Sequence, residues 1–330
     1  MKIAVVILNW NGKYLLKEFL PSVIAHSKEA TIYVADNASS DGSVEFLKRK
    51  FPDVQVIQNK DNLGYAGGYN FALKSVKEPL FILLNSDVEV TKNWLEPIIS
   101  VFENEPETAA IQPKILDYKK KSHFEYAGAA GGYMDKFGYP FCRGRIFQQL
   151  EEDYGQYNDD QYIFWASGAC LAIRAEAFNE MGGLDEDFFA HQEEIDLCWR
   201  LLNQGHKIKY VAGSSVFHVG GATLQEMNPK KTFYNFRNGL FLLLKNVDSS
   251  KLYYILFVRM ILDGIAGFKF IFEGKFNHFF AILKAHSSFY KHYGKMHKKR
   301  PKEFIFRKYY LISSVVYAHF IQKKNKFRDL

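Results

Sequence analysis

The chain has 330 residues, of which 48% are hydrophobic, so it can fold as one large domain or as a domain with an appendage. Its net charge of +7 is unevenly placed: residues 284–330 contain 13 Lys or Arg and two acids, which leaves the rest slightly acidic. The three cysteines have no CxxC spacing, which excludes a disulfide framework and a zinc knuckle and favours a reducing compartment.

Two apolar stretches bear on the location of the protein. The first, residues 3–8, ends at Asn9 before it reaches the length of a signal peptide, so we expect no export. The longest, residues 252–272, contains three charged residues that make a membrane-spanning helix costly: Arg259, Asp263 and Lys269. We therefore expect a cytoplasmic protein.

Strands and helices alternate over the first hundred residues. We predict strands at 3–8, 31–35, 54–57 and 79–84, and helices at about 14–25, at 43–50 and up to about 76. This alternation indicates a doubly wound α/β sheet, in which ligands bind at the carboxyl ends of the strands.

The pattern weakens after residue 108. We interpret residues 109–161 as an elaborated loop region over the site, because no clean period is visible among Gly128, Gly131, Gly132, Gly138 and Gly144. Order returns at residues 163–174, followed by helices at 175–181 and 192–202. Residues 207–211 and 215–218 are predicted as two short strands.

Each of the first four predicted strands ends in a loop of small and polar residues. The most informative is Asn85-Ser86-Asp87, because an acid at the end of a buried strand can hold a divalent cation that neutralises a diphosphate leaving group. Turn chemistry alone also places such residues at strand ends. Four such loops at one edge of a sheet favour a binding site.

Seven motifs follow one another along the chain: Val5-Val6-Ile7-Leu8-Asn9-Trp10-Asn11-Gly12, Asp36-Asn37-Ala38-Ser39-Ser40-Asp41-Gly42, Asn62-Leu63-Gly64, Asn85-Ser86-Asp87, Gly182-Gly183-Leu184-Asp185-Glu186, Glu193-Glu194-Ile195-Asp196 and His218. In this order the sequence resembles the family 2 glycosyltransferases of the GT-A fold, and most of all the rhamnosyltransferase-like branch that builds bacterial cell-surface polysaccharide. The resemblance implies a GT-A domain at 1–240, with a nucleotide-binding part at 1–108 and an acceptor and catalytic part at 109–240. A basic, aromatic, helical region at 241–330 would follow.

The resemblance also implies the donor site. It assigns the nucleotide pocket to Asn9, Asp36, Asn37, Asn62, Gly64 and Asn85. Asp87 matches the last residue of the DxD motif, which binds Mg²⁺ or Mn²⁺ and the diphosphate. His218 matches a histidine that completes the metal site in some relatives, although a hydrogen-bonded core histidine is an equal alternative. Asn85 stands where many members have the first Asp, so this chain has one fewer carboxylate for the metal.

Inversion at the anomeric carbon needs a base that takes the proton of the acceptor hydroxyl. The resemblance places this base at Glu194, with Glu193 as the second candidate. A Glu here, where the family has Asp, moves the carboxylate outward by one methylene. The remaining expected contacts with the donor sugar, the acceptor or a phosphate are Ser167, Gly168, Asp185, Asp196 and Arg237. Tight strand packing explains Ser167 and Gly168 equally well.

The C-terminal segment 291–308 is basic and aromatic, which suits the anionic inner face of a membrane. A helical cap on the core or a homodimer contact stays open as an alternative, and we expect no nucleic-acid partner. The leading prediction is a metal-dependent transfer of a sugar, for example from dTDP-rhamnose, to a glycan or polyprenyl-linked acceptor. Its rivals are a nucleotidyltransferase and a non-catalytic, membrane-docked subunit that binds nucleotide sugars. A dinucleotide oxidoreductase is disfavoured, because residues 64–68 lack the GxGxxG spacing.

Overall fold

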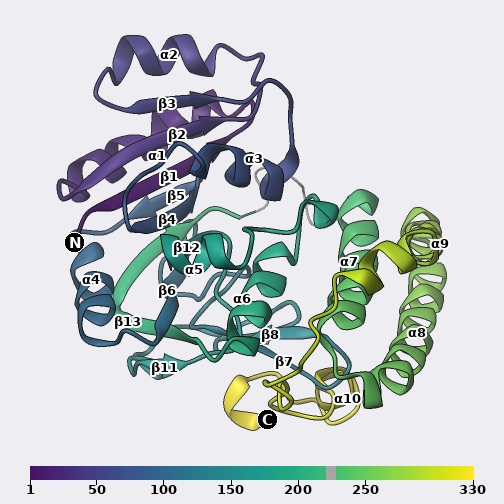
Figure 1. Ribbon diagram of the computed structural model, residues 1–330. Helices are drawn as coiled ribbons and strands as arrows, with labels where there is room; N and C mark the ends of the chain where they lie inside the picture. The colour runs from purple at the N-terminus through teal and green to yellow at the C-terminus, as the bar shows by residue number, and fades with distance from the viewer. Residues whose placement is uncertain (221–227) are drawn as a thin grey trace.

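The computed structural model describes residues 1–220 and 228–330. Its main element is a nine-stranded mixed sheet with helices on both faces (Figure 1). The strand order is β11-β13-β6-β12-β4-β1-β2-β3, and β5 pairs with β13. The expected mixed α/β sheet is therefore confirmed.

The first four strands of the chain run parallel: β1 (Ile3–Asn9), β2 (Ala30–Asp36), β3 (Gln55–Gln58) and β4 (Leu80–Asn85). β1 and β4 are continuous apolar runs because both of their faces are buried. One face carries α1 (Lys13–His26), α2 (Ser43–Lys50) and α4 (Leu95–Asn104). The other carries α3 (Gly64–Leu73), α5 (Ala175–Glu180) and α6 (Glu193–Asn203).

The second half of the sheet corrects two expectations. The stretch predicted as loop begins with a ten-residue strand, β6 (Thr108–Asp117), which pairs with β12 (Cys170–Arg174) and with β13 (Lys207–His218). β13 is a single strand where two were predicted, because a register shift between Val211 and Ser215 absorbs the break. β5 (Val88–Val90) and β11 (Gln161–Tyr162) pair antiparallel with β13.

Residues 132–150 form a small antiparallel sheet. Its strands are β7 (Gly132–Met134), β8 (Pro140–Cys142), β9 (Arg145–Ile146) and β10 (Gln149–Leu150). The C-terminal region contacts this sheet: the N–H of Leu311 donates to the carbonyl of Met134, and the hydroxyl of Tyr139 donates to Asp263. This part of the chain therefore supports the C-terminal region.

The C-terminal region is helical, as expected. It contains α7 (Pro229–Asn246), α8 (Ser249–Phe272), α9 (Phe276–Lys298) and α10 (Val315–Phe320), and the first three stand side by side beyond α6 (Figure 1). The predicted boundary after residue 240 falls inside α7, in its buried segment. Among the described residues, no helix is both long and apolar enough to cross a membrane.

Candidate functional site

The carboxyl ends of the first four strands lie at one edge of the sheet. Asn9 is level with Asp36, and Leu8 is level with Asn85. The side-chain amide of Asn9 donates to Oδ2 of Asp36 over 2.9 Å, and both side chains are buried. The side-chain oxygen Oδ1 of Asn9 is buried without a hydrogen-bond partner among the described residues. A buried acceptor without a partner is a common sign of a ligand site.

The loop after β3 is held by the side-chain amide of Asn37, which follows β2. Nδ2 of Asn37 donates to Oδ1 of Asn62 over 2.9 Å and to the carbonyl of Gly64 over 3.0 Å. Gly64 has a φ of 70°, and a Cβ there would lie 2.5 Å from the carbonyl oxygen of Phe189. The N–H of Tyr65 donates to that same carbonyl. Asn37 and Asn62 thus fix the loop, and the loop contacts the segment that precedes α6.

The predicted metal residues lie together where β5 and β13 pair. Oδ1 of Asp87 is 3.2 Å from Nε2 of His218, and Nδ2 of Asn85 is 3.3 Å from the same nitrogen. On the other side of the imidazole ring, Oε2 of Glu125 is 3.2 Å from Nδ1 of His218. A carboxylate on the second nitrogen of a metal-binding histidine fixes the orientation of its ring. Sequence reasoning missed Glu125, which lies in a stretch without a pattern.

The charges of this group are mutually dependent. Burial alone would raise the pKa of Asp87, but the charge of His218 and its hydrogen bond lower it below its usual value. Burial alone would lower the pKa of His218, but Glu125 and Asp87 raise it well above its usual range. Nε2 of His218 therefore faces Asp87 as a proton donor.

Asp87 and His218 fit a divalent cation that is shared with the donor. No cluster of three or more His, Cys, Asp or Glu able to hold a metal occurs within residues 1–220 and 228–330. Mg²⁺ and Mn²⁺ do not need one, because Mg²⁺ is usually held by one or two carboxylates together with substrate phosphates and water. Asp87 and His218 are the residues that would hold such a cation, which would supply positive charge for the phosphates of a donor.

The two candidate bases open α6, and they differ in environment. Glu193 is 3% exposed, and burial followed by the charge of Glu194 raises its pKa well above the usual range. Glu194 is only partly buried, and burial raises its pKa to about 7 although backbone N–H groups of the helix oppose the rise. A base with a pKa near the working pH is suited to proton transfer. Of the two, Glu194 is the carboxyl that a ligand can reach.

The turn before these acids is conformationally strained. Phe189, His191 and Gln192 all have φ values of 65° to 70°, which non-glycine residues rarely adopt. Nε2 of His191 and Oε1 of Gln192 are buried and have no hydrogen-bond partner among the described residues. Strain and unpaired polar atoms of this kind concentrate at functional sites.

One predicted sugar contact, Asp196, lies in the interior instead. Asp196 is fully buried, and its carboxylate accepts from Lys245 over 2.8 Å, from Arg200 over 2.8 Å and from Asn246 over 2.9 Å. Burial alone would raise the pKa of Asp196, but Lys245 and Arg200 lower it far below its usual value. Nζ of Lys245 also donates to Asp185 over 2.6 Å. Asp196 therefore has a structural role, because its oxygens are already committed.

Arg237 likewise binds the protein itself. Its guanidinium donates to the carbonyls of Asp187 and Phe188, over 3.0 and 2.9 Å, in the 3-10 turn η1 (Glu186–Phe188). Asp185 caps this turn and accepts from Lys245 and Lys299. Asp185 thus orders this turn, and the phosphate contact expected of Arg237 has no counterpart in these bonds.

The buried pair of Lys245 and Asp196 leads to a stability prediction. We expect Lys245→Met to lower the free energy of unfolding by roughly 3 kcal/mol, because the fully buried Asp196 loses one of its two cationic partners and keeps only Arg200. Urea unfolding followed by circular dichroism measures this loss. The control is Lys48→Met on the exposed side of α2, where a change within about 0.5 kcal/mol is expected. Equal stability of the two variants would contradict the assignment.

Ser167 and Gly168 lie at the same sheet edge, in tight contact with other elements. The hydroxyl of Tyr65 donates to the carbonyl of Gly168 over 2.7 Å, and a Cβ on Gly168 would lie 2.8 Å from that hydroxyl. A Cβ on Gly128 would lie 2.5 Å from Cβ of Ser167. Packing thus explains the small residues. Sequence reasoning did not single out Tyr65, whose side chain connects the start of α3 to Gly168.

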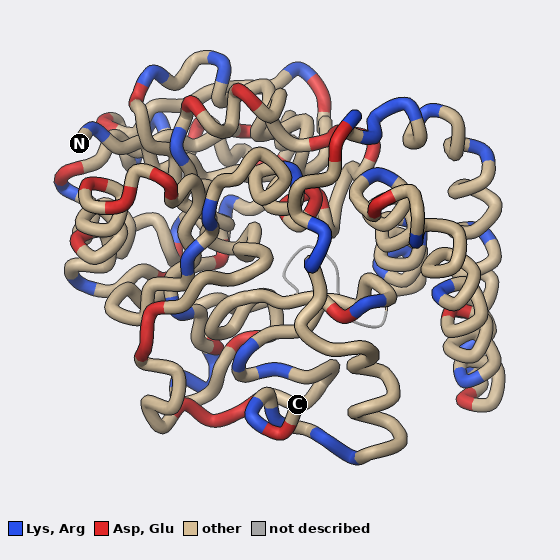
Figure 2. The backbone as a smooth tube through the Cα atoms, turned by 60° about the horizontal axis from the view of Figure 1, so that its bottom comes forward, with Lys and Arg blue, Asp and Glu red and all other residues tan. Residues whose placement is uncertain are grey.

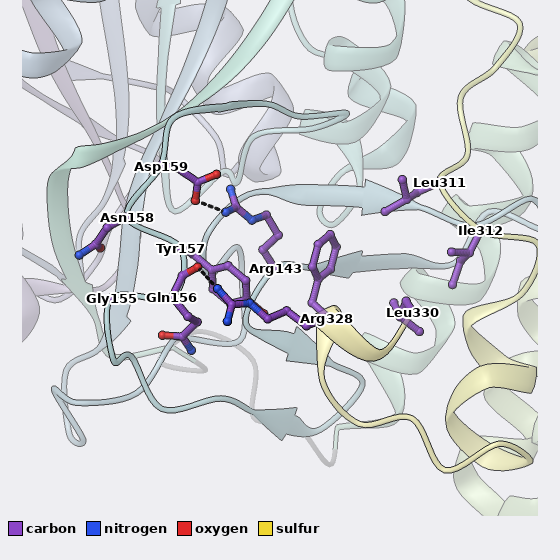
Figure 3. A pocket seen from close by; sticks show the side chains of 11 residues that line it. Arg143, Gly155, Gln156, Tyr157, Asn158, Asp159, Leu311, Ile312, Arg328 and Leu330 are labelled. Atoms are coloured by element: carbon purple, nitrogen blue, oxygen red, sulfur yellow. Dashed lines mark hydrogen bonds and ion pairs between the residues drawn. The ribbon is translucent and has the colours of Figure 1, made fainter.

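A cavity of substantial volume lies elsewhere. It has a volume of about 840 Å³ and lies between the segment around Tyr157 and the C-terminal segment around Phe327 (Figure 3). Arg143 and Arg328 flank the ring of Tyr157, with the guanidinium carbons 4.8 and 5.5 Å from the ring centre. Not one of the predicted site residues lines this cavity. We therefore base the site on the sheet edge.

Comparison with known proteins agrees with this geometry. The sequence profile of glycosyl transferase family 2 matches residues 4–182. The chain is 26% identical over 218 residues to N-acetylglucosaminyl-diphospho-decaprenol L-rhamnosyltransferase of Mycobacterium tuberculosis, covering 62% of this chain and 71% of that protein. It is 23% identical over 229 residues to rhamnosyltransferase WbbL of Escherichia coli, covering 65% of this chain and 82% of that protein.

A solved structure shows the same fold. The mannosyltransferase PcManGT from Pyrobaculum calidifontis, in complex with GDP-Man and Mn²⁺, superimposes with a TM-score of 0.53 at 12% identity, over 88% of this chain and 75% of that one. This likeness confirms the expected GT-A fold. Since the family profile matches more than half of the chain, and both relatives are rhamnosyltransferases, the chain belongs to glycosyl transferase family 2, in its rhamnosyltransferase-like branch.

Proposed function

We propose that this protein transfers a sugar, with inversion, from a nucleoside diphosphate donor to a glycan or polyprenyl-linked acceptor in bacterial cell-surface polysaccharide synthesis. The observation that carries the proposal is the pair of Asp87 and His218 beside the buried amide and acid of Asn9 and Asp36. dTDP-rhamnose is the leading donor, because the relatives are named for rhamnose transfer. The polyprenyl-linked acceptor follows the name of the mycobacterial relative.

In this proposal each group has one task. Asp87 and His218 hold Mg²⁺ or Mn²⁺, and the bound cation neutralises charge on the departing diphosphate. Glu194 takes the proton of the acceptor hydroxyl as its oxygen attacks the anomeric carbon from the side opposite the diphosphate. The bond from the anomeric carbon to the diphosphate oxygen breaks as the new glycosidic bond forms, and the nucleoside diphosphate leaves. Asn9 and Asp36 bind the nucleoside.

The proposal includes a place in the cell. A polyprenyl-linked acceptor lies in a membrane, so the protein would work as a cytoplasmic, peripheral protein on the inner face of the cell membrane. Two alternatives have specific signatures. A non-catalytic subunit would bind nucleotide sugars without transfer or hydrolysis, and a nucleotidyltransferase would release diphosphate from a nucleoside triphosphate.

Thermal unfolding with a panel of nucleotide sugars tests the donor class. We expect dTDP-rhamnose with Mn²⁺ to raise the melting temperature more than UDP- or GDP-sugars, and to do so less without metal. A ligand at 100 times its Kd stabilises by about 2.7 kcal/mol. Mass spectrometry of a synthetic N-acetylglucosaminyl diphosphate lipid, incubated with the stabilising donor, then tests transfer. Stabilisation without any product would favour the binding subunit, and no stabilisation by any nucleotide sugar would contradict the proposal.

A further inference from the structure

The outer helices of the C-terminal region have an inverted distribution of polarity. On α8, seven large apolar side chains are between 49% and 88% exposed: Tyr253, Tyr254, Phe257, Ile261, Ile265, Phe268 and Phe272. The charged residues Arg259 and Asp263 of the same helix are buried and paired over 2.7 Å. A helix in contact with water alone would present the opposite pattern.

The exposed side chains of α8 form one continuous face. They recur at intervals of three or four residues from Phe257 through Ile261, Ile265 and Phe268 to Phe272, which places them on one side of the helix. α9, which packs on α8, has an exposed apolar row of its own, with exposed fractions of 50% to 61% at Phe276, Phe280, Leu283 and Tyr290. We call these eleven residues the α8–α9 face. Monomeric soluble proteins rarely leave so many large apolar side chains together in water.

Positive charge surrounds the α8–α9 face. Lys251, Lys269, Lys284 and Lys291 are exposed on the two helices. The single acid on these two helices is the buried Asp263. The exposed Glu273 follows α8 and pairs with Lys269 and Lys275. In Figure 2 these helices are mostly tan, with blue spaced along them and little red. Apolar and aromatic side chains flanked by lysines match the boundary of a bilayer that contains anionic lipids.

The basic segment that the sequence singled out is partly committed to other contacts. Lys295 pairs with Asp187 over 2.5 Å, and Lys299 pairs with Asp185 and Asp187. The guanidinium of Arg300 donates to the carbonyls of Leu244 and Val247. These cations bind the protein. Lys251, Lys284 and Lys291 are exposed and form no ion pair with another described residue, so they are available to meet a lipid surface.

We propose that the α8–α9 face docks on an anionic membrane surface, with its apolar side chains at the headgroup boundary and its lysines against lipid phosphates. A second copy of the chain fits the α8–α9 face less well. In a symmetric dimer the lysines of both copies would lie close together and repel one another. The docking stands on the geometry of the helices alone. Its use, to hold the site near a polyprenyl-linked acceptor, rests on the proposed function.

Cosedimentation of the full chain with vesicles tests the docking. We expect binding to vesicles of phosphatidylglycerol and phosphatidylcholine, and at least about tenfold weaker binding to phosphatidylcholine alone. Two variants address the two parts of the face: Phe257→Ser/Phe268→Ser/Phe272→Ser, and Lys251→Glu/Lys284→Glu/Lys291→Glu. Each should weaken binding by about tenfold or more while circular dichroism stays unchanged. The matched control is Tyr154→Ser/Tyr162→Ser, which removes exposed aromatic rings outside α8 and α9 and should bind as the wild type does.

Several outcomes would overturn the docking. Wild-type protein that stays in solution would do so, as would either triple variant binding as well as the control. A concentration-dependent dimer that the Phe→Ser variant abolishes, without vesicle binding, would assign the face to a second copy. Failure of the proposed function is distinguishable: a protein without transferase activity would still bind vesicles, and the Phe→Ser variant should use a water-soluble acceptor at the wild-type rate.

Discussion

Replacing Glu194 with Gln should lower the turnover number by roughly 10²–10⁴-fold while the protein still binds its nucleotide sugar, because general-base catalysis contributes about that factor. The amide fills the same space as the carboxylate but cannot accept the proton of the acceptor hydroxyl. Steady-state transfer kinetics measure the loss, and thermal shift with the donor reports binding. Glu194→Asp should recover part of the rate, since its carboxylate is one methylene shorter.

The pH profile is an independent readout of the same assignment. Because burial raises the pKa of Glu194 to about 7, the wild-type rate should fall as the pH drops below about 7 and the carboxylate becomes protonated. This limb should be absent from the residual activity of Glu194→Gln.

Glu193→Gln is the matched control for the assignment of the base. Burial raises the pKa of Glu193 well above its usual range, which favours its neutral form, so an amide there mimics the side chain more closely than at Glu194. We expect this variant to stay within about tenfold of the wild-type rate. A collapse in Glu193→Gln together with full activity in Glu194→Gln would transfer the role of the base to Glu193.

Replacing Asp87 with Asn should lower transfer by roughly 10²–10³-fold, because a metal ion contributes several kcal/mol of charge stabilisation in such reactions. Asn85 already supplies an amide at this site, so the variant leaves no carboxylate directly facing Nε2 of His218. Titration with Mn²⁺ in the presence of a nucleoside diphosphate should show a weaker apparent affinity. Removal of metal with EDTA should silence the wild type, and added Mn²⁺ should restore it.

The control for the metal prediction is Asp53→Asn, an exposed acid in the turn before β3, which should keep the wild-type rate and metal response. Full activity of Asp87→Asn in EDTA would contradict a metal role for Asp87. Glu125→Gln separates the direct ligand from its support. Glu125→Gln should weaken Mn²⁺ binding by about 10–100-fold, because Glu125 orients His218 and is not itself a metal ligand. Excess Mn²⁺ should therefore restore the activity of this variant.

The first half of the fold was predictable because its signals are local. β1 and β4 are buried on both faces, so their sequences are unbroken apolar runs that stop at Asn9 and Asn85. β6 was not predictable in this way, since Gln112, Pro113 and Lys114 interrupt its apolar pattern. Lys114 is tolerated inside because Asp153 accepts from it over 2.7 Å, and this partner lies 39 residues later in the chain.

The site residues also differ in whether a local sequence signal identifies them. Asp87 follows a readable strand, and His218 ends another, so the motif order was enough to bring them together. Glu125 gave no signal, because its role depends on an imidazole 93 residues away along the chain. The sequence motif around Asp196 suggested a sugar contact. Only the fold shows that Lys245 donates a hydrogen bond to its carboxylate.

The contact between α9 and the turn η1 has a consequence for the choice of buffer. The side chain of Lys295 is 59% exposed and that of Lys299 is 34% exposed, so their ion pairs with Asp185 and Asp187 are screened by dissolved salt. The same turn reaches the loop after β3 through the carbonyl of Phe189. At high ionic strength the contacts of the turn that lie away from bulk solvent remain, among them those from the buried Lys245, the half-buried Arg237 and the buried Asn238. Ionic strength thus changes how firmly α9, but not α7, holds the turn that contacts the loop after β3.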